Sequence, residues 1–189
     1  ESLHRDAKIQ QAYDALIASM SAFDKPILAV VQGPAVGLGV AILCFCDMVY
    51  CGEKSLFSVP FTALGLTPEF GLTFSLCEKA GFKKAMEKLL LSEPISAFEA
   101  LQMGIVTSVF KDEDVLKETL ARAARLTVLP PGSLRATKAL MRKHQGIAIR
   151  EALNAEHDAL TQRLQSDEVK EACRAFEEGR KPDFSVRPH

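Results

Sequence analysis

The chain has 189 residues, of which 48% are hydrophobic and 25% charged, and its formal net charge is −1. This length fits one globular domain, or one domain with a helical appendage. Lysines and arginines are scattered among acidic residues and form no basic stripe, so nucleic acid is not an expected partner. The longest apolar runs, residues 27–31 and 40–46, are too short to span a bilayer, and the amino end shows no hydrophobic signal region. We therefore expect a soluble chain without a membrane span.

The hydrophobic pattern divides the chain into two halves. Up to about Phe110, short β-rich runs alternate with helices, as in β-α-β units. The elements expected there are a helix at 6–22, a strand at 27–32, a helix at 37–46, strands at 48–51 and 56–59, helices at 68–79 and 82–91, a helix capped by the Ser96 to Glu99 pattern, and a strand at 105–110. After residue 112 the pattern is helical throughout, with helices expected at 114–127, 132–144, 149–165 and 167–179. The sequence thus predicts an α/β core over residues 1–111 and a helical carboxyl-terminal region over 112–189.

Cysteines and histidines give no sign of a metal site. The five cysteines are odd in number, lie in apolar contexts and lack C-x-x-C pairing, which is typical of buried thiols in a reducing compartment. They are Cys44, Cys46, Cys51, Cys77 and Cys173. The four histidines, His4, His144, His157 and His189, have no ligand spacing and stand in polar settings. We predict buried cysteines, exposed histidines and no metal.

Glu69 is the one charged residue between Ser55 and Cys77. Removing water from a carboxylate favours its protonated form, which lets it take and return a proton near neutrality. A simpler interpretation is also open: Thr67 could cap a helix that begins at Pro68, with Glu69 in the first turn as a partner of the helix dipole. Glu69 is the best candidate for chemistry, and the choice between these interpretations depends on its neighbours.

A glycine-rich turn, residues 33–39, joins a buried strand to an apolar helix. Glycines permit unusual backbone angles and close approach of a ligand, and the first turn of a helix has N–H groups without intrahelical partners. The spacing G-x-x-x-G-x-G does not match a nucleotide-binding loop or a dinucleotide fingerprint. The turn could bind an oxyanion, or it could simply allow tight helix packing.

Several separated motifs give the chain a resemblance to a known superfamily. They are K-P-I-L-A-V-V-Q-G-P-A-V-G-L-G-V-A-I-L-C-F-C-D at 25–47, F-S-V-P-F at 57–61, I-S-A-F-E-A-L-Q-M-G-I-V at 95–106 and F-E-E-G-R-K-P-D-F at 176–184. In this order they resemble the crotonase (enoyl-CoA hydratase/isomerase) superfamily. The resemblance implies a ββα superhelix followed by a helical trimerisation region, with acyl-CoA as substrate and no separate cofactor.

The resemblance also implies roles for individual residues. The Leu38 N–H falls where the family has one of two donors that bind the thioester oxygen. The two glutamates of enoyl-CoA hydratases correspond to Ala41 and Phe61, so hydration is not expected. Glu69 lies in a segment similar to the one that carries the single base of peroxisomal-type Δ3,Δ2-enoyl-CoA isomerase. Expected substrate contacts are Ala35, Val36, Gly37, Phe61, Leu64, Phe70 and Gly71, with weaker expected CoA phosphate contacts at Arg180 and Lys181.

Alternatives remain open at this level. A dienoyl-CoA isomerase would carry a second acid where this chain has Phe61, and some crotonase-like modules bind acyl-CoA or act as scaffolds without turnover. Family members are usually longer, and the strands and second oxyanion donor that precede the first helix are expected outside the given sequence. By resemblance we expect a homotrimer or hexamer. The compartment expected from the Glu69 segment is the peroxisome or a related organelle, with the mitochondrion as the alternative.

Overall fold

The computed structural model describes residues 7–143 and 145–185. The strands are β1 (Leu28–Val31), β2 (Pro34–Val36), β3 (Met48–Gly52), β4 (Leu56–Ser58), β5 (Ile95–Ser96) and β6 (Ser108–Phe110). The helices of the core half are α1 (Ala7–Ala22), α2 (Leu38–Phe45), the short 3-10 helix η1 (Thr62–Leu64), α3 (Leu72–Ala80), α4 (Phe82–Leu91) and α5 (Ala97–Gln102). Those of the carboxyl-terminal half are α6 (Val115–Thr127), α7 (Pro131–Lys143), α8 (Gln145–Arg163) and α9 (Asp167–Glu177).

Two small sheets organise the core half. One has the order β1-β3-β6 with parallel pairing, and Leu28 to Val31 of β1 lie opposite Met48 to Cys51 of β3. The other has the order β2-β4-β5, in which β2 pairs in parallel with β4 and β5 pairs antiparallel to it. Because α2 lies in the connection between β1 and β3, this part of the chain is the β-α-β arrangement that the sequence predicted.

The apolar core lies between the sheets and helices α2, α3 and α4. Its largest fully buried side chains include Phe57 of β4, Phe70 beside α3, and Leu72 and Leu76 of α3. The helix α3 contacts α4, α2 and α8. Since α3 is shared by the core and the carboxyl-terminal helices, its start is a point where both halves meet.

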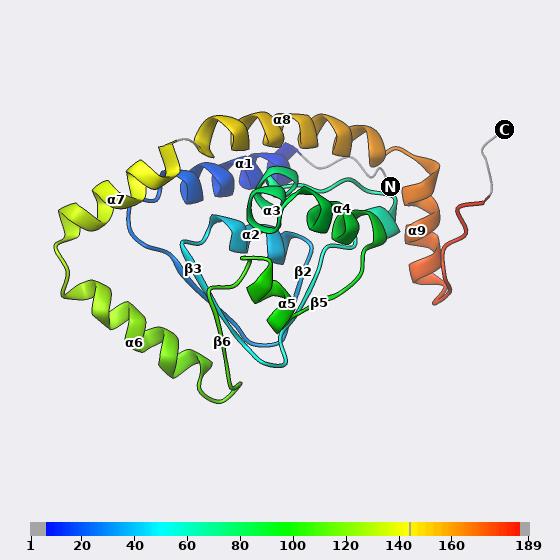
Figure 1. Ribbon diagram of the computed structural model, residues 1–189. Helices are drawn as coiled ribbons and strands as arrows, with labels where there is room; N and C mark the ends of the chain where they lie inside the picture. Colours follow the sequence, from blue (N-terminus) through cyan, green and yellow to red (C-terminus); the bar gives the residue numbers. More distant parts are fainter. Residues whose placement is uncertain (1–6, 144, 186–189) are drawn as a thin grey trace.

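The helices after β6 wrap around the core half rather than extending away from it (Figure 1). In Figure 1, α8 runs alongside α1 above α2 and α3, and α9 descends on the other side of the molecule. The helix α9 packs against η1, where the Arg163 side chain at the end of α8 donates a hydrogen bond of 2.9 Å to the Gly65 carbonyl. A mixed α/β core with a helical carboxyl-terminal part is therefore confirmed. The division at residues 111 and 112 stays a prediction.

Most predicted element positions agree with the structure within a few residues, and 82–91 is confirmed as α4. The Ser96 cap is present, since its hydroxyl accepts a hydrogen bond of 3.2 Å from the Glu99 N–H. The strands β2 and β5 were not predicted, because two or three residues carry too little periodicity. The predicted helix ends at Asp6 and His144 lie outside the described residues.

Candidate active site

Glu69 lies in an irregular turn between η1 and α3. The two residues after it, Phe70 and Gly71, have left-handed backbones with φ of 65° and 71°, and α3 begins only at Leu72. The prediction that Thr67 caps a helix starting at Pro68 is therefore wrong, because two consecutive left-handed residues interrupt the helical path. The Thr67 hydroxyl is instead buried, and it has no hydrogen-bond partner among the residues that the structure describes. Glu69 is consequently not a first-turn partner of the α3 dipole.

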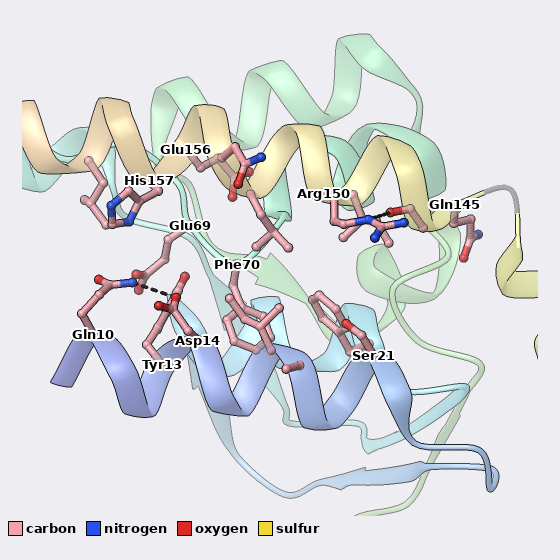
Figure 2. Close-up of a pocket in the computed structure, with 18 of the residues that line it drawn as sticks. Gln10, Tyr13, Asp14, Ser21, Glu69, Phe70, Gln145, Arg150, Glu156 and His157 are labelled. Carbon is pink, nitrogen blue, oxygen red and sulfur yellow. Dashed lines mark hydrogen bonds between the residues drawn. The ribbon is translucent and has the colours of Figure 1, made fainter. Parts of the chain in front are cut away.

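The Glu69 side chain points into a cavity between α1 and α8 (Figure 2). The cavity has a volume of about 820 Å³. Its walls come from α1, the last residue of α2, the turn at Glu69 and Phe70, and α8. Figure 2 shows the partly buried Glu69 between Gln10 on α1 and His157 on α8. The carboxylate thus faces the space between two helices, as a base for an enclosed substrate would.

Aromatic rings form the floor of this cavity. The Phe70 ring is fully buried and lies edge-to-face against Phe45 and Tyr13, with centroid distances of 4.8 and 5.5 Å. Aliphatic side chains complete the apolar lining: Ile17, Ile149, Leu153 and Leu160. Polar and charged groups also line it: Gln10, Asp14, Ser21, Glu69, Arg142, Gln145, Arg150, Asn154, Glu156 and His157. An apolar chain could be accommodated on this floor while Glu69 approaches it from the side.

Glu156, on α8, is a second carboxylate in the cavity wall, and it was not predicted from the sequence. Its exposed fraction is 5%. Burial raises the pKa of Glu156 and the nearby Glu69 charge raises it further, while hydrogen bonds from Thr73 and Gly71 offset part of this effect. One signal could have found it: Leu153, Glu156 and Leu160 are spaced by three and four residues, so the acid lies on the apolar face of its helix.

The glycine turn is built by β2 and the start of α2. Gly37 has φ of 55°, its N–H donates a 2.8 Å hydrogen bond to the Ser58 carbonyl, and its own carbonyl accepts from the Val40 and Ala41 N–H groups. Leu38, the first residue of α2, has its N–H at the helix start, where no intrahelical acceptor exists. The turn therefore has the geometry of an anion-binding helix start, with the Leu38 amide as the expected donor.

The two positions that the resemblance matches to hydratase glutamates are apolar and buried. Ala41 is fully buried in α2, and Phe61 is 6% exposed. The tip of the Phe61 ring lies 3.9 Å from the position that a Gly37 Cβ would occupy, so the ring packs directly beside the glycine turn. A water molecule at this turn would therefore meet an aromatic ring where a hydratase has a carboxylate.

The predicted site residues fall into separate groups. Glu69 and Phe70 share the cavity, whereas Leu38 does not belong to the cavity lining within the described residues. Phe45, at the other end of α2, does line it. Leu38 and Phe45 lie about 10 Å apart along the helix axis, at 1.5 Å per residue. The other predicted contacts lie near the glycine turn or around η1 and α3: Ala35 is half-buried in β2, Val36 and Leu64 are exposed, and Gly71 is the N-cap of α3.

The predicted phosphate contact Arg180 is engaged by carboxylates. Its guanidinium contacts Glu171 at 2.5 Å and Glu178 at 2.5 Å. Arg180 also holds the pKa of Glu171 down at about 2, together with a hydrogen bond from the Asp183 N–H. A phosphate would have to displace these partners. Lys181 is exposed.

The cysteine prediction is wrong in part. Cys51 is buried and Cys44, Cys46 and Cys77 are half-buried, but Cys173 is exposed on α9. His157 is exposed at the cavity, while His4, His144 and His189 lie outside the described residues. Across residues 7–143 and 145–185, no three histidine, cysteine or acidic side chains are grouped closely enough to hold a metal ion. In the same part of the chain, no helix is both long and apolar enough to cross a membrane.

The α/β core, the amide turn and the helical cover are those of the crotonase class of proteins. The sequence matches the enoyl-CoA hydratase/isomerase family model over residues 1–187. It is 33% identical to 2,3-dehydroadipyl-CoA hydratase of Escherichia coli over 96% of this chain and 71% of that protein. It is 38% identical to human enoyl-CoA delta isomerase 2 over 82% of this chain and 39% of that protein. A crystal structure of an enoyl-CoA hydratase from Mycobacterium avium subsp. paratuberculosis superposes with a TM-score of 0.89 at 33% identity, covering 95% of this chain and 73% of that one. The chain belongs to the enoyl-CoA hydratase/isomerase family.

Proposed function

We propose that the full protein is a Δ3,Δ2-enoyl-CoA isomerase, which converts 3-enoyl-CoA to trans-2-enoyl-CoA in the β-oxidation of unsaturated fatty acids. One observation carries this choice: Ala41 and Phe61 are buried apolar residues at the hydratase positions, while Glu69 is a carboxylate in the cavity. Relatives are named for both reactions, so the choice depends on residues of this chain. CoA enters as part of the substrate.

The proposed chemistry needs one base. Glu69 takes a proton from C2 of the substrate, which leaves a dienolate whose negative charge collects on the thioester oxygen, and then returns a proton to C4. The Leu38 N–H stabilises that oxygen, and losing one such donor typically raises the barrier by about 3–4 kcal/mol. Hydration instead requires a pair of groups that hold and split a water molecule, and Phe61 supplies neither a base nor an acid.

The proposal assigns the apolar floor of the cavity to the acyl chain. The half-buried Tyr13, Ile17 and Leu153 present the surface of this floor, and Glu69 lies beside it. The buried Phe70 and Phe45 rings pack beneath it. The bound thioester must extend from the start of α2 to Glu69, since these groups have to act on the same conjugated system. Water excluded by this surface is unavailable to attack the intermediate.

The test uses the purified full-length protein with 3-hexenoyl-CoA and crotonyl-CoA. Glu69→Gln keeps the size of the side chain and removes the base, so we expect isomerisation to fall about 10²–10⁴-fold while substrate binding is retained. The matched control is Glu151→Gln, an exposed acid on α8 outside the cavity lining. Rapid hydration of crotonyl-CoA would contradict the proposal. An unchanged rate in Glu69→Gln would show that another group is the base, and binding without turnover of either substrate would indicate an acyl-CoA-binding module.

We also propose a cellular compartment and an oligomeric state for the full protein. A peroxisomal location, with the mitochondrion as the alternative, is supported by the likeness of the Glu69 segment to peroxisomal-type isomerases. A homotrimer or hexamer is supported by family likeness. Fluorescence imaging of the full-length protein and its sedimentation would test them.

A further inference from the structure

The turn that carries Glu69 is held in a conformation that its sequence does not favour. Phe70 has a Cβ atom and a bulky ring, yet its φ is 65°, a region that costs an ordinary L-residue free energy and persists only where surrounding contacts enforce it. Among the described residues, Ser92 is the only other non-glycine residue with a positive φ. Something outside the turn must therefore hold it.

Glu156 on α8 supplies one part of that hold, and packing of the buried Phe70 ring against Phe45 and Tyr13 supplies another. Its Oε2 accepts a hydrogen bond of 2.6 Å from the Gly71 N–H, and its Oε1 accepts bonds of 2.7 and 2.5 Å from the Thr73 N–H and hydroxyl. These donors are the two residues on either side of Leu72, immediately after Phe70. Glu156 lies 83 and 85 positions away from them in sequence.

The carboxylate replaces a cap that α3 lacks. Gly71 is the N-cap of α3 and has no side chain to bond the first N–H groups. Within the described part of the chain, no salt bridge links Glu156 to a lysine or arginine. These three hydrogen bonds and the positive end of the α3 dipole offset part of the cost of burying its charge. The Glu156 carboxylate therefore acts as the hydrogen-bond acceptor that caps the start of α3.

We propose that Glu156 is a positioning residue for the isomerase reaction: its carboxylate holds Gly71 and Thr73, which keeps Phe70 left-handed and aims Glu69 into the cavity. The catalytic part of this inference rests on the proposed function. We assign Glu156 this positioning role rather than that of a second base, because the Gly71 and Thr73 donors take three of the roughly four acceptor sites of its carboxylate. A merely structural role, docking α8 on the core, would affect stability without selectively affecting turnover.

The decisive variant is Glu156→Gln in the full-length protein. An amide has one acceptor oxygen, so its NH₂ group must face either the Gly71 or the Thr73 donors, and part of the hold is lost without a change in size. We expect faster amide hydrogen exchange at Gly71 and Thr73, kcat lowered about 10²-fold by misplacement of Glu69, and little change in KM. Glu151→Gln, on the exposed face of α8, should leave amide exchange at Gly71 and Thr73, kcat and KM unchanged.

A second pair keeps the inference falsifiable if Glu156→Gln fails to fold. Thr73→Val removes only the hydroxyl bond to Glu156 and should lower kcat by less than Glu156→Gln, whereas Thr73→Ser keeps the hydroxyl and should behave as wild type.

Unchanged exchange at Gly71 and Thr73 in folded Glu156→Gln would overturn the inference, and so would faster exchange with wild-type kcat. Should wild type lack isomerase activity, the proposed function fails, while the exchange data still decide whether Glu156 holds the turn.

Discussion

At the scale of single residues, Gly37 determines how the glycine turn presents its amides. Its positive φ of 55° turns the chain from β2 into α2, and its N–H is fixed to the Ser58 carbonyl at 2.8 Å. The space for a Cβ is open, since the nearest atom, Cζ of Phe61, would be 3.9 Å away. A side chain at this position is therefore opposed by backbone strain rather than by a steric clash.

Gly37→Ala is expected to lower the free energy of unfolding by about 1–3 kcal/mol, because residues with a Cβ rarely adopt φ of 55° with ψ of −115°. It should also lower the isomerisation rate, since relief of the strain would move the Leu38 N–H. Urea denaturation and the 3-hexenoyl-CoA assay measure the two effects. Gly132→Ala in α7, where nothing lies within 4 Å of the added Cβ, is the control and should not destabilise the protein. An equal loss of unfolding free energy in Gly37→Ala and Gly132→Ala would show that backbone strain at Gly37 is not the cause.

At the scale of elements, α7 is attached to the core through Asp47, which lies between α2 and β3. This carboxylate accepts hydrogen bonds from the Ile27 N–H at 2.7 Å, from Lys138 at 2.8 Å and from Arg142 at 2.7 Å. Burial alone would raise the pKa of Asp47, but the bonds from Lys138 and Ile27 and the charge of Arg142 outweigh it and lower the pKa below its ordinary 3.8.

Asp47→Asn should lower the free energy of unfolding by about 2 kcal/mol near neutral pH, because hydrogen bonds to a charged group are lost. The folded-state pKa is lowered, so this contribution is present above about pH 3.8 and disappears as the pH falls through the folded-state value. Urea denaturation at several pH values should show wild type and variant converging on acidification. Asp24→Asn is the matched control, since its ion pair with Arg135 of α7 is exposed and is expected to contribute less than about 1 kcal/mol. A constant difference at all pH values would contradict the assignment.

Local sequence signals predicted the elements that depend on local contacts. The helix at 82–91 and the Ser96 cap are examples, because glycine, serine and periodic apolar residues lie within the element itself. The helix start at Pro68 was predicted wrongly, since the Thr67 cap signal is overridden by Glu156 and by ring packing of Phe70 against Phe45 and Tyr13. Glu69 stood out in sequence as a lone acid, but the residue that holds its turn belongs to a helix more than 80 positions away.

At the scale of the whole molecule, the carboxyl-terminal helices contribute to the site as well as to the surface. The helix α8 forms one wall of the Glu69 cavity and supplies Glu156, while α1 forms the opposite wall (Figure 2). The α/β half and the helical carboxyl-terminal half of the chain therefore form one cavity between them.

The outer helices also carry apolar surface that a second copy of the chain could cover. Leu116 and Leu120 lie one turn apart on α6 and are 48% and 59% exposed, and Val128 at the end of α6 is 82% exposed. Exposed apolar groups on one helix face are typical of protein interfaces.

We expect the full-length protein to sediment at three times its chain mass, or six times. Leu120→Glu should shift it toward monomers, because a charge would be buried in the contact, whereas Ala121→Glu, which adds the same charge about a quarter-turn away on α6, should have less effect. A wild-type protein that sediments as a monomer, or equal effects of the two variants, would contradict an interface at this face.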